Sequence, residues 1–498
     1  MKKNRKLVFL TGATGMMGRY ALKHFLKLND QFKMRILVRP SRKNRLKMFV
    51  YYFNRNVKIV WGDLTDKEDL LYCVAGADYV LHLGAMVSPQ ADKYPKATIR
   101  INLGATNMLI DAIKAQPNAD DIALVYIGTV GQTGGRTTPI HWGRCGDPIK
   151  GAMLDTYTTS KIAAERAVFE SGLKKWVSIR QTGMLPFRMS AILQPIIFHQ
   201  NANNVIEWAT AEESAVLLAG ICSDDVPDSF WRKCYNIGGG EKWRFTYWEF
   251  MNMTLKLIGV TFDQFFDAQD LALYNFHGMW YTDSDALNDI IPFRIEDPQV
   301  YMKKFNAKIA FFCNNPLVSW IVSSTSILHK IGKRVAKKHM GPQWMIDNNE
   351  EDWIKAFFGS RTKKDAIKSW EEGNELLIPS KEKTYLNHGY DERKGDENLA
   401  IDDMRGAAVF RGGECLSETM KKGDLLTPIH WRCAFGHEFD ATPNLVLRGG
   451  HWCPQCERES WNFAEQAKVN PFFAQVWTPI HGNDDAVVIK KEYNDLSV

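Results

Sequence analysis

Residues 6–18 read KLVFLTGATGMMG, a short apolar run that ends in a glycine-rich turn. Residues 19–27 then continue with helix-forming residues whose apolar side chains recur at helical spacing. The pattern predicts a strand, a tight turn and a helix. Glycines suit such a turn because the backbone must bend sharply and let an anion such as pyrophosphate approach the first amide groups of the helix.

Further apolar runs follow at 34–38, 57–63, 78–85, 123–128 and 176–180, with helical patterns between them. Strands that alternate with helices predict a parallel sheet covered on both faces. We therefore expect an α/β fold with a doubly wound sheet of the Rossmann type.

Composition limits the protein class. The chain has 498 residues, of which 45% are hydrophobic and 24% charged, which is typical of a globular protein and excludes disordered and collagen-like chains. A domain has about 150 residues, so two or three folded units are expected. The net charge of +6 suits phosphate-bearing ligands but does not call for a nucleic-acid partner.

Cysteine usage and the N-terminus predict a cytoplasmic location. The nine cysteines are odd in number and widely spread, unlike the framework of a small secreted domain. The N-terminal apolar run stops after four residues, too soon for a signal peptide. Residues 309–328 are uncharged and long enough for a membrane span, but their Asn, Pro and Ser content favours a packed helix, with contact to a membrane surface as the alternative.

We divide the chain into four parts from these patterns. Residues 1–255 form the dinucleotide-binding domain, and residues 256–405, which are rich in tryptophan and phenylalanine, form a mostly helical substrate-side region. Residues 406–460 form a metal-binding module, and residues 461–498 form a C-terminal tail. The charged stretch 381–398 is interpreted as a linker or exposed loop.

The second strand ends at Arg39, where a site that prefers NAD usually carries an acid. An arginine can instead bind the 2′-phosphate of NADP. Arg42 and Lys43 follow closely. NADP is therefore the expected cofactor, and NAD is the alternative. The competing explanation of these three charges is a solvated basic surface that binds no cofactor.

Eight motifs in sequence order resemble the extended branch of the short-chain dehydrogenase/reductase superfamily, the NAD(P)-dependent epimerase/dehydratase family. The resemblance covers about the first half of the chain. The motifs are TGATGMMG at 11–18, WGDLTD at 61–66, HLGA at 82–85, NLGAT at 102–106, IGTVGQTG at 127–134, YTTSK at 157–161, SIRQTG at 178–183 and YNIGGG at 235–240.

The resemblance implies a set of cofactor-binding positions. Gly84 stands where the family more often has alanine, and both residues are small enough for the cofactor to pass. Besides Tyr157 and Lys161, the implied cofactor contacts are Gly12, Thr14, Gly15, Met16, Met17, Gly18, Arg39, Asp63, Leu64, Leu83, Gly84 and Ala85.

The expected catalytic pair is Tyr157 and Lys161, which are four residues apart in a predicted helix and so project from one face. A lysine ammonium beside a tyrosine, together with an oxidised nicotinamide ring, stabilises the phenolate and makes proton transfer practical. The resemblance adds Thr129 as the residue that binds the substrate oxygen and Asn102 as the holder of a water. His82, between two leucines of a predicted strand, is interpreted as a structural residue.

Two departures from the family's motifs argue against two of its reactions, dehydration and epimerisation. Dehydratases of this branch carry an acidic pair directly after the active-site threonine, whereas Val130 and Gly131 stand here. Epimerases usually end the second strand with an acid, whereas Arg39 stands here. We therefore expect an NADP-dependent oxidoreductase that acts on a small carbonyl or hydroxyl compound. The alternatives are an NAD-dependent nucleotide-sugar epimerase and an NADP-sensing adaptor that binds a partner through its metal module. The family also implies a homodimer.

A metal site is predicted near the C-terminus. Cys433 and His437 are followed, after fifteen residues, by Cys453 and Cys456. Three cysteines and one histidine form a closed tetrahedral set for structural zinc. The surrounding sequence resembles small zinc-ribbon or treble-clef domains. His430 and His451 are rivals for the place of His437, Cys415 is left without a metal, and a redox Cys-x-x-Cys is the alternative.

Overall fold

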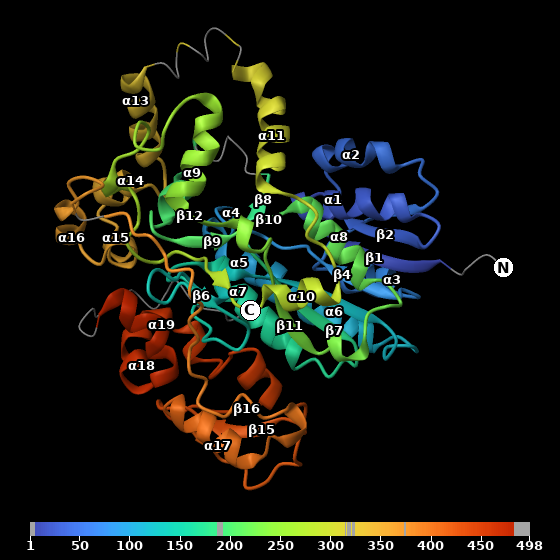
Figure 1. Cartoon of the computed structure of the whole chain (residues 1–498). Coiled ribbons are helices and arrows are strands. Elements are labelled where there is room, and N and C mark those ends of the chain that lie inside the picture. Colours follow the sequence, from blue (N-terminus) through green and yellow to red (C-terminus); the bar gives the residue numbers. More distant parts are fainter. Residues whose placement is uncertain are drawn as a thin grey trace.

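The computed structural model describes residues 5–186, 193–313, 315, 320, 324–372 and 375–482. Its centre is a sheet of seven parallel strands in the order β11-β7-β5-β4-β1-β2-β3 (Figure 1). The strands are β1 (Lys6–Thr11), β2 (Phe32–Val38), β3 (Val57–Trp61), β4 (Tyr79–His82), β5 (Ala123–Thr129), β7 (Trp176–Gln181) and β11 (Lys233–Ile237). The predicted Rossmann-type fold is confirmed.

Helices cover both faces of this sheet. Side chains alternate along a strand, so Phe9 packs in the core on one face while Val8 and Leu10 pack in the core on the other. The first core includes side chains of α3 (Lys67–Val74), α6 (Ala105–Lys114) and α7 (Thr156–Phe169), and the second includes those of α1 (Met16–Phe25) and α8 (Ala211–Ile221). Smaller helices beside the sheet are α2 (Arg42–Met48), α4 (Gln90–Lys93), α5 (Pro95–Ile99) and α10 (Ser284–Ile290).

The substrate-side region has a third core, rich in aromatic rings, that draws on segments before and after residue 255. Trp208 stacks on Phe250 with ring centroids 3.9 Å apart. The remaining strands and helices of residues 142–366 lie outside the central sheet. They are β6 (Trp142–Gly143), β8 (Met184–Leu185), β9 (Val205–Glu207), β10 (Ala209–Thr210), β12 (Arg244–Thr246), β13 (Trp280–Tyr281), α9 (Tyr247–Leu255), α11 (Pro298–Cys313), α13 (Thr325–Ala336), α14 (Pro342–Asp347), α15 (Glu351–Phe358) and α16 (Arg361–Ala366).

Part of the uncharged stretch 309–328 lies outside the described residues. Among the helices that are described, none combines the length and the apolar character that crossing a membrane requires.

The C-terminal part packs beneath the sheet (Figure 1). It contains α17 (Ile401–Phe410), β14 (Glu414–Cys415), β15 (Ile429–Arg432), β16 (Glu438–Ala441), α18 (Phe463–Val469) and α19 (Pro471–His481). Its Trp431, Val446 and Trp452 belong to the same hydrophobic core as Phe169 and Trp176 of α7 and β7. The module thus shares a core with the dinucleotide-binding domain.

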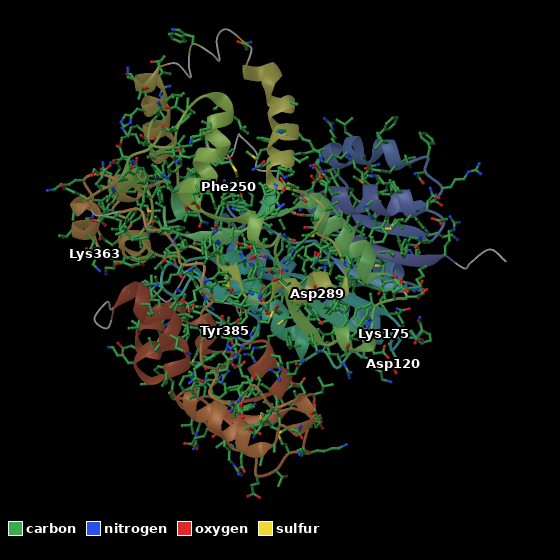
Figure 2. All side chains as sticks on the ribbon, viewed as in Figure 1. Asp120, Lys175, Phe250, Asp289, Lys363 and Tyr385 are labelled. Carbon is green, nitrogen blue, oxygen red and sulfur yellow. The ribbon has the colours of Figure 1, made fainter. Side chains whose placement is uncertain are left out.

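The segment 381–398 forms polar contacts with the loop at 141–147. The His388 Nε2 lies 2.9 Å from an oxygen of Asp147, and the Arg144 guanidinium lies over the ring of Tyr385. Tyr385 is labelled in Figure 2. The stretch interpreted as a linker is therefore attached to the rest of the protein by several contacts.

Candidate active site and metal centre

The turn between β1 and α1 requires glycine at two positions. Gly12 has a φ of +72°, and a Cβ there would lie 2.9 Å from the backbone of Leu83 and Gly84. A Cβ on Gly18 would lie 2.2 Å from the carbonyl oxygen of Gly12. The loop after β4 and the first turn of α1 therefore approach the turn more closely than any side chain allows.

A cavity of about 490 Å³ opens beside this turn at the carboxyl ends of the strands. Parallel sheets bind ligands at this edge. Its lining includes nine of the predicted cofactor contacts: Gly12, Thr14, Gly15, Arg39, Asp63, Leu64, Leu83, Gly84 and Ala85. Met16, Met17 and Gly18 lie in α1 and do not line it. Asn44, Gln90, Tyr94 and Ile101 also line the cavity and were not predicted.

Arg39 is exposed at the end of β2, and its side chain is free to reach a ligand in the cavity. Its carbonyl oxygen accepts a 2.9 Å hydrogen bond from Asn44 Nδ2, which orders the following loop. Arg42 and Lys43 begin α2 and do not line the cavity. Of these three cations, Arg39 alone therefore lines the cavity.

Thr129, Tyr157 and Lys161 lie on neighbouring elements. Thr129 ends β5, Tyr157 lies in the first turn of α7, and Lys161 lies one turn further along the same helix. Burial raises the pKa of Tyr157 to about 12, although a hydrogen bond with Thr129 lowers it. Burial also lowers the pKa of Lys161 to about 7, against the opposing effect of Glu165. In the protein without ligands, the tyrosine therefore stays protonated at neutral pH.

Asn102 fastens the loop after β4 to α7. Its Nδ2 donates to Ser160 Oγ at 2.9 Å and to the Met86 carbonyl at 3.0 Å, and its Oδ1 accepts from the Met86 amide at 2.8 Å. His82 is bonded at both ring nitrogens, to Thr11 and Thr106, at 3.0 Å each. Burial lowers the pKa of His82 to about 3, as a neutral structural histidine requires.

A second cavity of about 290 Å³ is lined by Tyr157, which does not line the cofactor cavity, and Val87 lines both cavities. We call it the substrate chamber. Tyr157 shares its lining with Asp92, Asp155, His199 and His277. Separate segments supply these groups, so no pattern in the sequence could have indicated them.

Asp92 is the acidic residue of this chamber whose pKa is raised by burial. Burial, followed by the charge of Asp155, raises the pKa of Asp92 to about 7. Asp155 is itself engaged as the N-cap of α7, where it accepts from the Thr158 amide at 2.9 Å. The sequence argument against dehydration considered the residues after Thr129, whereas the structure supplies the carboxyl group of Asp92 from the short helix α4.

A family model matches the part of the chain that forms the cofactor cavity. Residues 8–189 match the model of the NAD dependent epimerase/dehydratase family. This segment is an epimerase/dehydratase-family domain. It contains the glycine turn, the cofactor cavity and the Thr129, Tyr157 and Lys161 set.

Curated proteins similar to part of this chain include UDP-glucose 4-epimerases of Rickettsia massiliae and Rickettsia akari, each 34% identical over 113 residues. The match covers 22% of this chain and 33% of each relative. The chain thus spans about a third of the length of the curated relatives it matches.

Two solved structures are similar in fold. The dTDP-glucose 4,6-dehydratase of Bacillus anthracis in complex with NAD is 15% identical, with a TM-score of 0.48 over 63% of this chain and 98% of that chain. The UDP-glucose 4-epimerase of Bifidobacterium longum in complex with NAD+ and UDP is 15% identical, with a TM-score of 0.44 over 58% and 94%.

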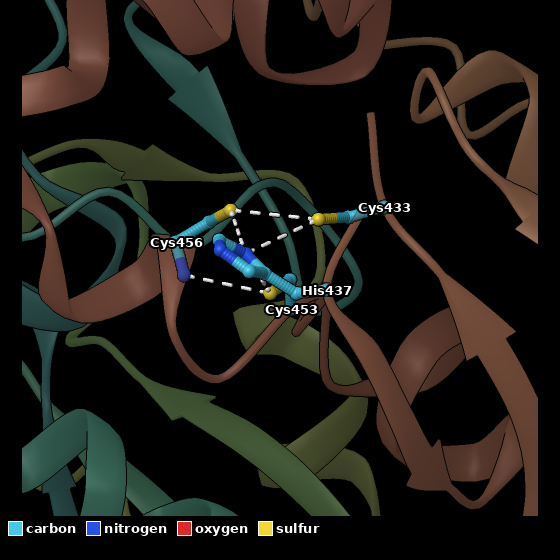
Figure 3. Close-up of side chains that lie close together, drawn as sticks. All are labelled: Cys433, His437, Cys453 and Cys456. Atoms are coloured by element: carbon cyan, nitrogen blue, oxygen red, sulfur yellow. Dashed lines mark hydrogen bonds between the residues drawn. The ribbon is translucent and has the colours of Figure 1, made fainter. Parts of the chain in front are cut away.

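The predicted metal ligands lie beyond the epimerase/dehydratase domain and converge on one point (Figure 3). The sulfurs of Cys433 and Cys456 are 3.8 Å apart, and the Nδ1 of His437 lies 3.4 Å, 3.5 Å and 3.6 Å from the sulfurs of Cys433, Cys453 and Cys456. With zinc–sulfur bonds of about 2.3 Å and zinc–nitrogen bonds of about 2.0 Å, a tetrahedron has edges of roughly 3.8 Å and 3.5 Å. The donor set therefore fits zinc.

The rival residues for this cluster lie elsewhere. His430 is on the exposed side of β15, where its Nδ1 lies 2.9 Å from Asp440 Oδ1. His451 is fully buried and contacts Glu165 and Glu457, at 3.1 Å each. Cys415 lies in β14 outside the cluster, as expected.

Proposed function

We propose that the protein is a nicotinamide-dependent oxidoreductase that interconverts a carbonyl and a hydroxyl group on a small molecule held in the substrate chamber. The observation that carries the proposal is the position of Tyr157, which lines the substrate chamber, together with Val87, which lines both that chamber and the cofactor cavity. A substrate carbon and a cofactor in these two spaces would meet beside the tyrosine hydroxyl.

In this proposal each residue has a separate task. A bound nicotinamide cofactor supplies or accepts the hydride. Tyr157 donates a proton to the substrate oxygen in reduction and removes it in oxidation. Thr129, already hydrogen-bonded to Tyr157, polarises the same oxygen. The Lys161 ammonium stabilises the phenolate and contacts the cofactor, and Asn102 holds the loop and helix together.

We further propose that NADP is preferred. Arg39 lines the cofactor cavity where an acid would pair with the unphosphorylated ribose, and its guanidinium can bind a 2′-phosphate by charge-assisted hydrogen bonds. The adenine and pyrophosphate would then occupy the space between Asp63 and the glycine turn.

We propose zinc as the ion of the Cys433, His437, Cys453 and Cys456 cluster. Four protein ligands complete a tetrahedron and leave no open position, so the role is structural.

A nucleotide-sugar 4-epimerase is the second candidate, because the matching curated relatives are UDP-glucose 4-epimerases. The two candidates differ in what happens to the cofactor. An oxidoreductase consumes free NADPH in proportion to product, whereas an epimerase keeps its cofactor and consumes none. The test is NADPH oxidation screened over carbonyl compounds, beside an assay of UDP-glucose and UDP-galactose interconversion. Epimerisation without NADPH consumption would overturn the oxidoreductase proposal.

A further inference from the structure

One carboxylate, Glu165, links the catalytic residues to the metal-binding module. Glu165 lies in α7, one helical turn after Lys161, and is fully buried. It accepts hydrogen bonds from Gln132 Nε2 at 2.6 Å, Ser178 Oγ at 2.5 Å and Arg180 Nη2 at 2.7 Å. Burial alone would raise the pKa of Glu165, but Arg180 and His451 hold it well below its usual range. The carboxylate is thus charged and fully engaged.

On the active-site side, Glu165 acts on two catalytic residues. Gln132 donates to Glu165 through Nε2 and accepts the Thr129 amide through Oε1 at 2.7 Å. The position of Thr129 therefore depends on Gln132 and, through it, on Glu165. The negative charge of Glu165 also favours the ammonium form of Lys161.

On the other side, the same network is completed by the loop that leads into the last two cysteines of the cluster. His451 Nε2 lies 3.1 Å from Glu165 Oε2, and Arg180 Nη2 donates to the Gly449 carbonyl at 2.6 Å. Directly after Glu165 in α7, Arg166 Nη2 lies 3.1 Å from both carboxylate oxygens of Glu457. These contacts lie on both sides of Cys453.

We propose that a metal ion bound by the Cys/His cluster positions α7, the helix of Tyr157 and Lys161, which we call the catalytic helix. The ion does so because it fixes the 449–457 loop, which supplies hydrogen-bond partners to the buried Glu165–Arg180 pair. Glu165 and His451 are then positioning residues for Thr129 and Lys161. The inference rests on the proposed function of those two residues. Small metal modules obtain much of their folding free energy from the ion, so its loss should release the loop. Buried charges that lose hydrogen-bond partners are costly, so α7 and the 129–133 turn would then rearrange.

Hydrogen exchange measured by mass spectrometry tests the coupling without any substrate. We compare the zinc-loaded protein, the protein stripped with a chelator, and a zinc-loaded His451→Asn variant. Stripping and His451→Asn should both speed exchange at least threefold in peptides covering 129–133 and 156–169. The matched control is His430→Asn, since His430 lies on the exposed side of the same module and should leave both peptides unchanged.

Kinetics on the zinc-loaded chain provides the second readout. Glu165→Gln and His451→Asn should lower kcat at least tenfold while the Kd of cofactor and the KM of substrate change less than threefold. Such a split separates positioning of the reacting groups from a general loss of folded protein. Glu165→Asp, which keeps the charge, should recover part of kcat.

The outcomes separate the two proposals. Unchanged exchange in both peptides after zinc loss and in His451→Asn overturns the coupling. Should the stripped protein unfold entirely, zinc-loaded His451→Asn still decides the question. Faster exchange in a protein that turns over none of the tested carbonyl compounds or nucleotide sugars would support the coupling and overturn the proposed function instead.

Discussion

The cofactor cavity and the catalytic helix α7 adjoin the same sheet but depend on different parts of the chain. The cavity is built by the turn after β1 and the ends of its neighbouring strands, and three of the family motifs, at 11–18, 61–66 and 82–85, supply residues to its walls. The catalytic helix α7 is held by residues almost three hundred positions away, such as His451 and Trp452. Cofactor binding should therefore withstand changes in the C-terminal module better than catalysis does.

The largest expected effect on turnover separates binding from chemistry at Tyr157. Tyr157→Phe should lower kcat by about 100-fold to 10,000-fold, the usual contribution of a positioned proton donor. Cofactor affinity should change little, because the ring remains. Steady-state kinetics and cofactor titration check both halves. A Phe variant with normal turnover would remove the tyrosine from the mechanism.

The second expected effect is a loss of zinc and of stability when a metal ligand is replaced. Cys453→Ser should abolish binding of one zinc per chain and lower the Tm, because the ion contributes roughly 10 kcal/mol or more to the folding of small modules. Cys415→Ser is the matched control and should keep the zinc, since Cys415 lies outside the cluster. Elemental analysis and thermal unfolding measure these outcomes. Zinc retained in Cys453→Ser would contradict the ligand assignment.

The third effect is a change in cofactor preference, which should not alter the structure of the catalytic helix. Arg39→Asp should shift the ratio of NADPH to NADH affinity by about 10-fold to 100-fold toward NADH, since hydrogen bonds to charged groups contribute about 1.5–3 kcal/mol. Arg42→Asp serves as control because Arg42 does not line the cavity. Calorimetry with the two cofactors measures the shift, and equal shifts in both variants would remove Arg39 from the 2′-phosphate site.

The smallest effect concerns Asp92. Because its pKa is raised to about 7, the protonated form that can donate to a substrate oxygen predominates below pH 7 and is lost above it. KM should therefore rise about two- to tenfold as pH rises through 7, the contribution of one hydrogen bond. Asp92→Asn should remove this dependence, because its amide donates at every pH.

The matched control is Asp111→Asn, an exposed change in α6 that should keep the pH dependence. Folding also opposes ionisation of Asp92, so its contribution to stability is lost as pH rises through about 7, and Asp92→Asn should unfold at a higher temperature than the natural chain at pH 8. Identical KM–pH profiles in the natural chain and Asp92→Asn would exclude this role.

Local patterns predicted six strands, the glycine turn and the four metal ligands, because each depends on residues close together in sequence. The seventh strand, β11, was missed because KCYNI is not a continuous apolar run. Asp92 and His277 could not be assigned to one chamber, since the fold alone brings them together.

The role of His451 was equally hidden from the sequence. Its place beside Trp452 and Cys453 suggested a metal ligand, whereas a contact 286 positions away engages it with Glu165. The sequence also predicts that the dinucleotide-binding domain folds without the module. The shared core leads us to expect that truncation near residue 405 destabilises α7.

Isotope transfer tests the central claim, hydride transfer beside Tyr157, most directly. NADPH carrying deuterium at the transferred position is incubated with the carbonyl compounds that support its oxidation, and the product is analysed by mass spectrometry. The account predicts one deuterium per product molecule, and about 100-fold to 10,000-fold slower formation of the labelled product with Tyr157→Phe. Products without deuterium, or a sugar inverted in configuration while the cofactor stays bound and unconsumed, would contradict it.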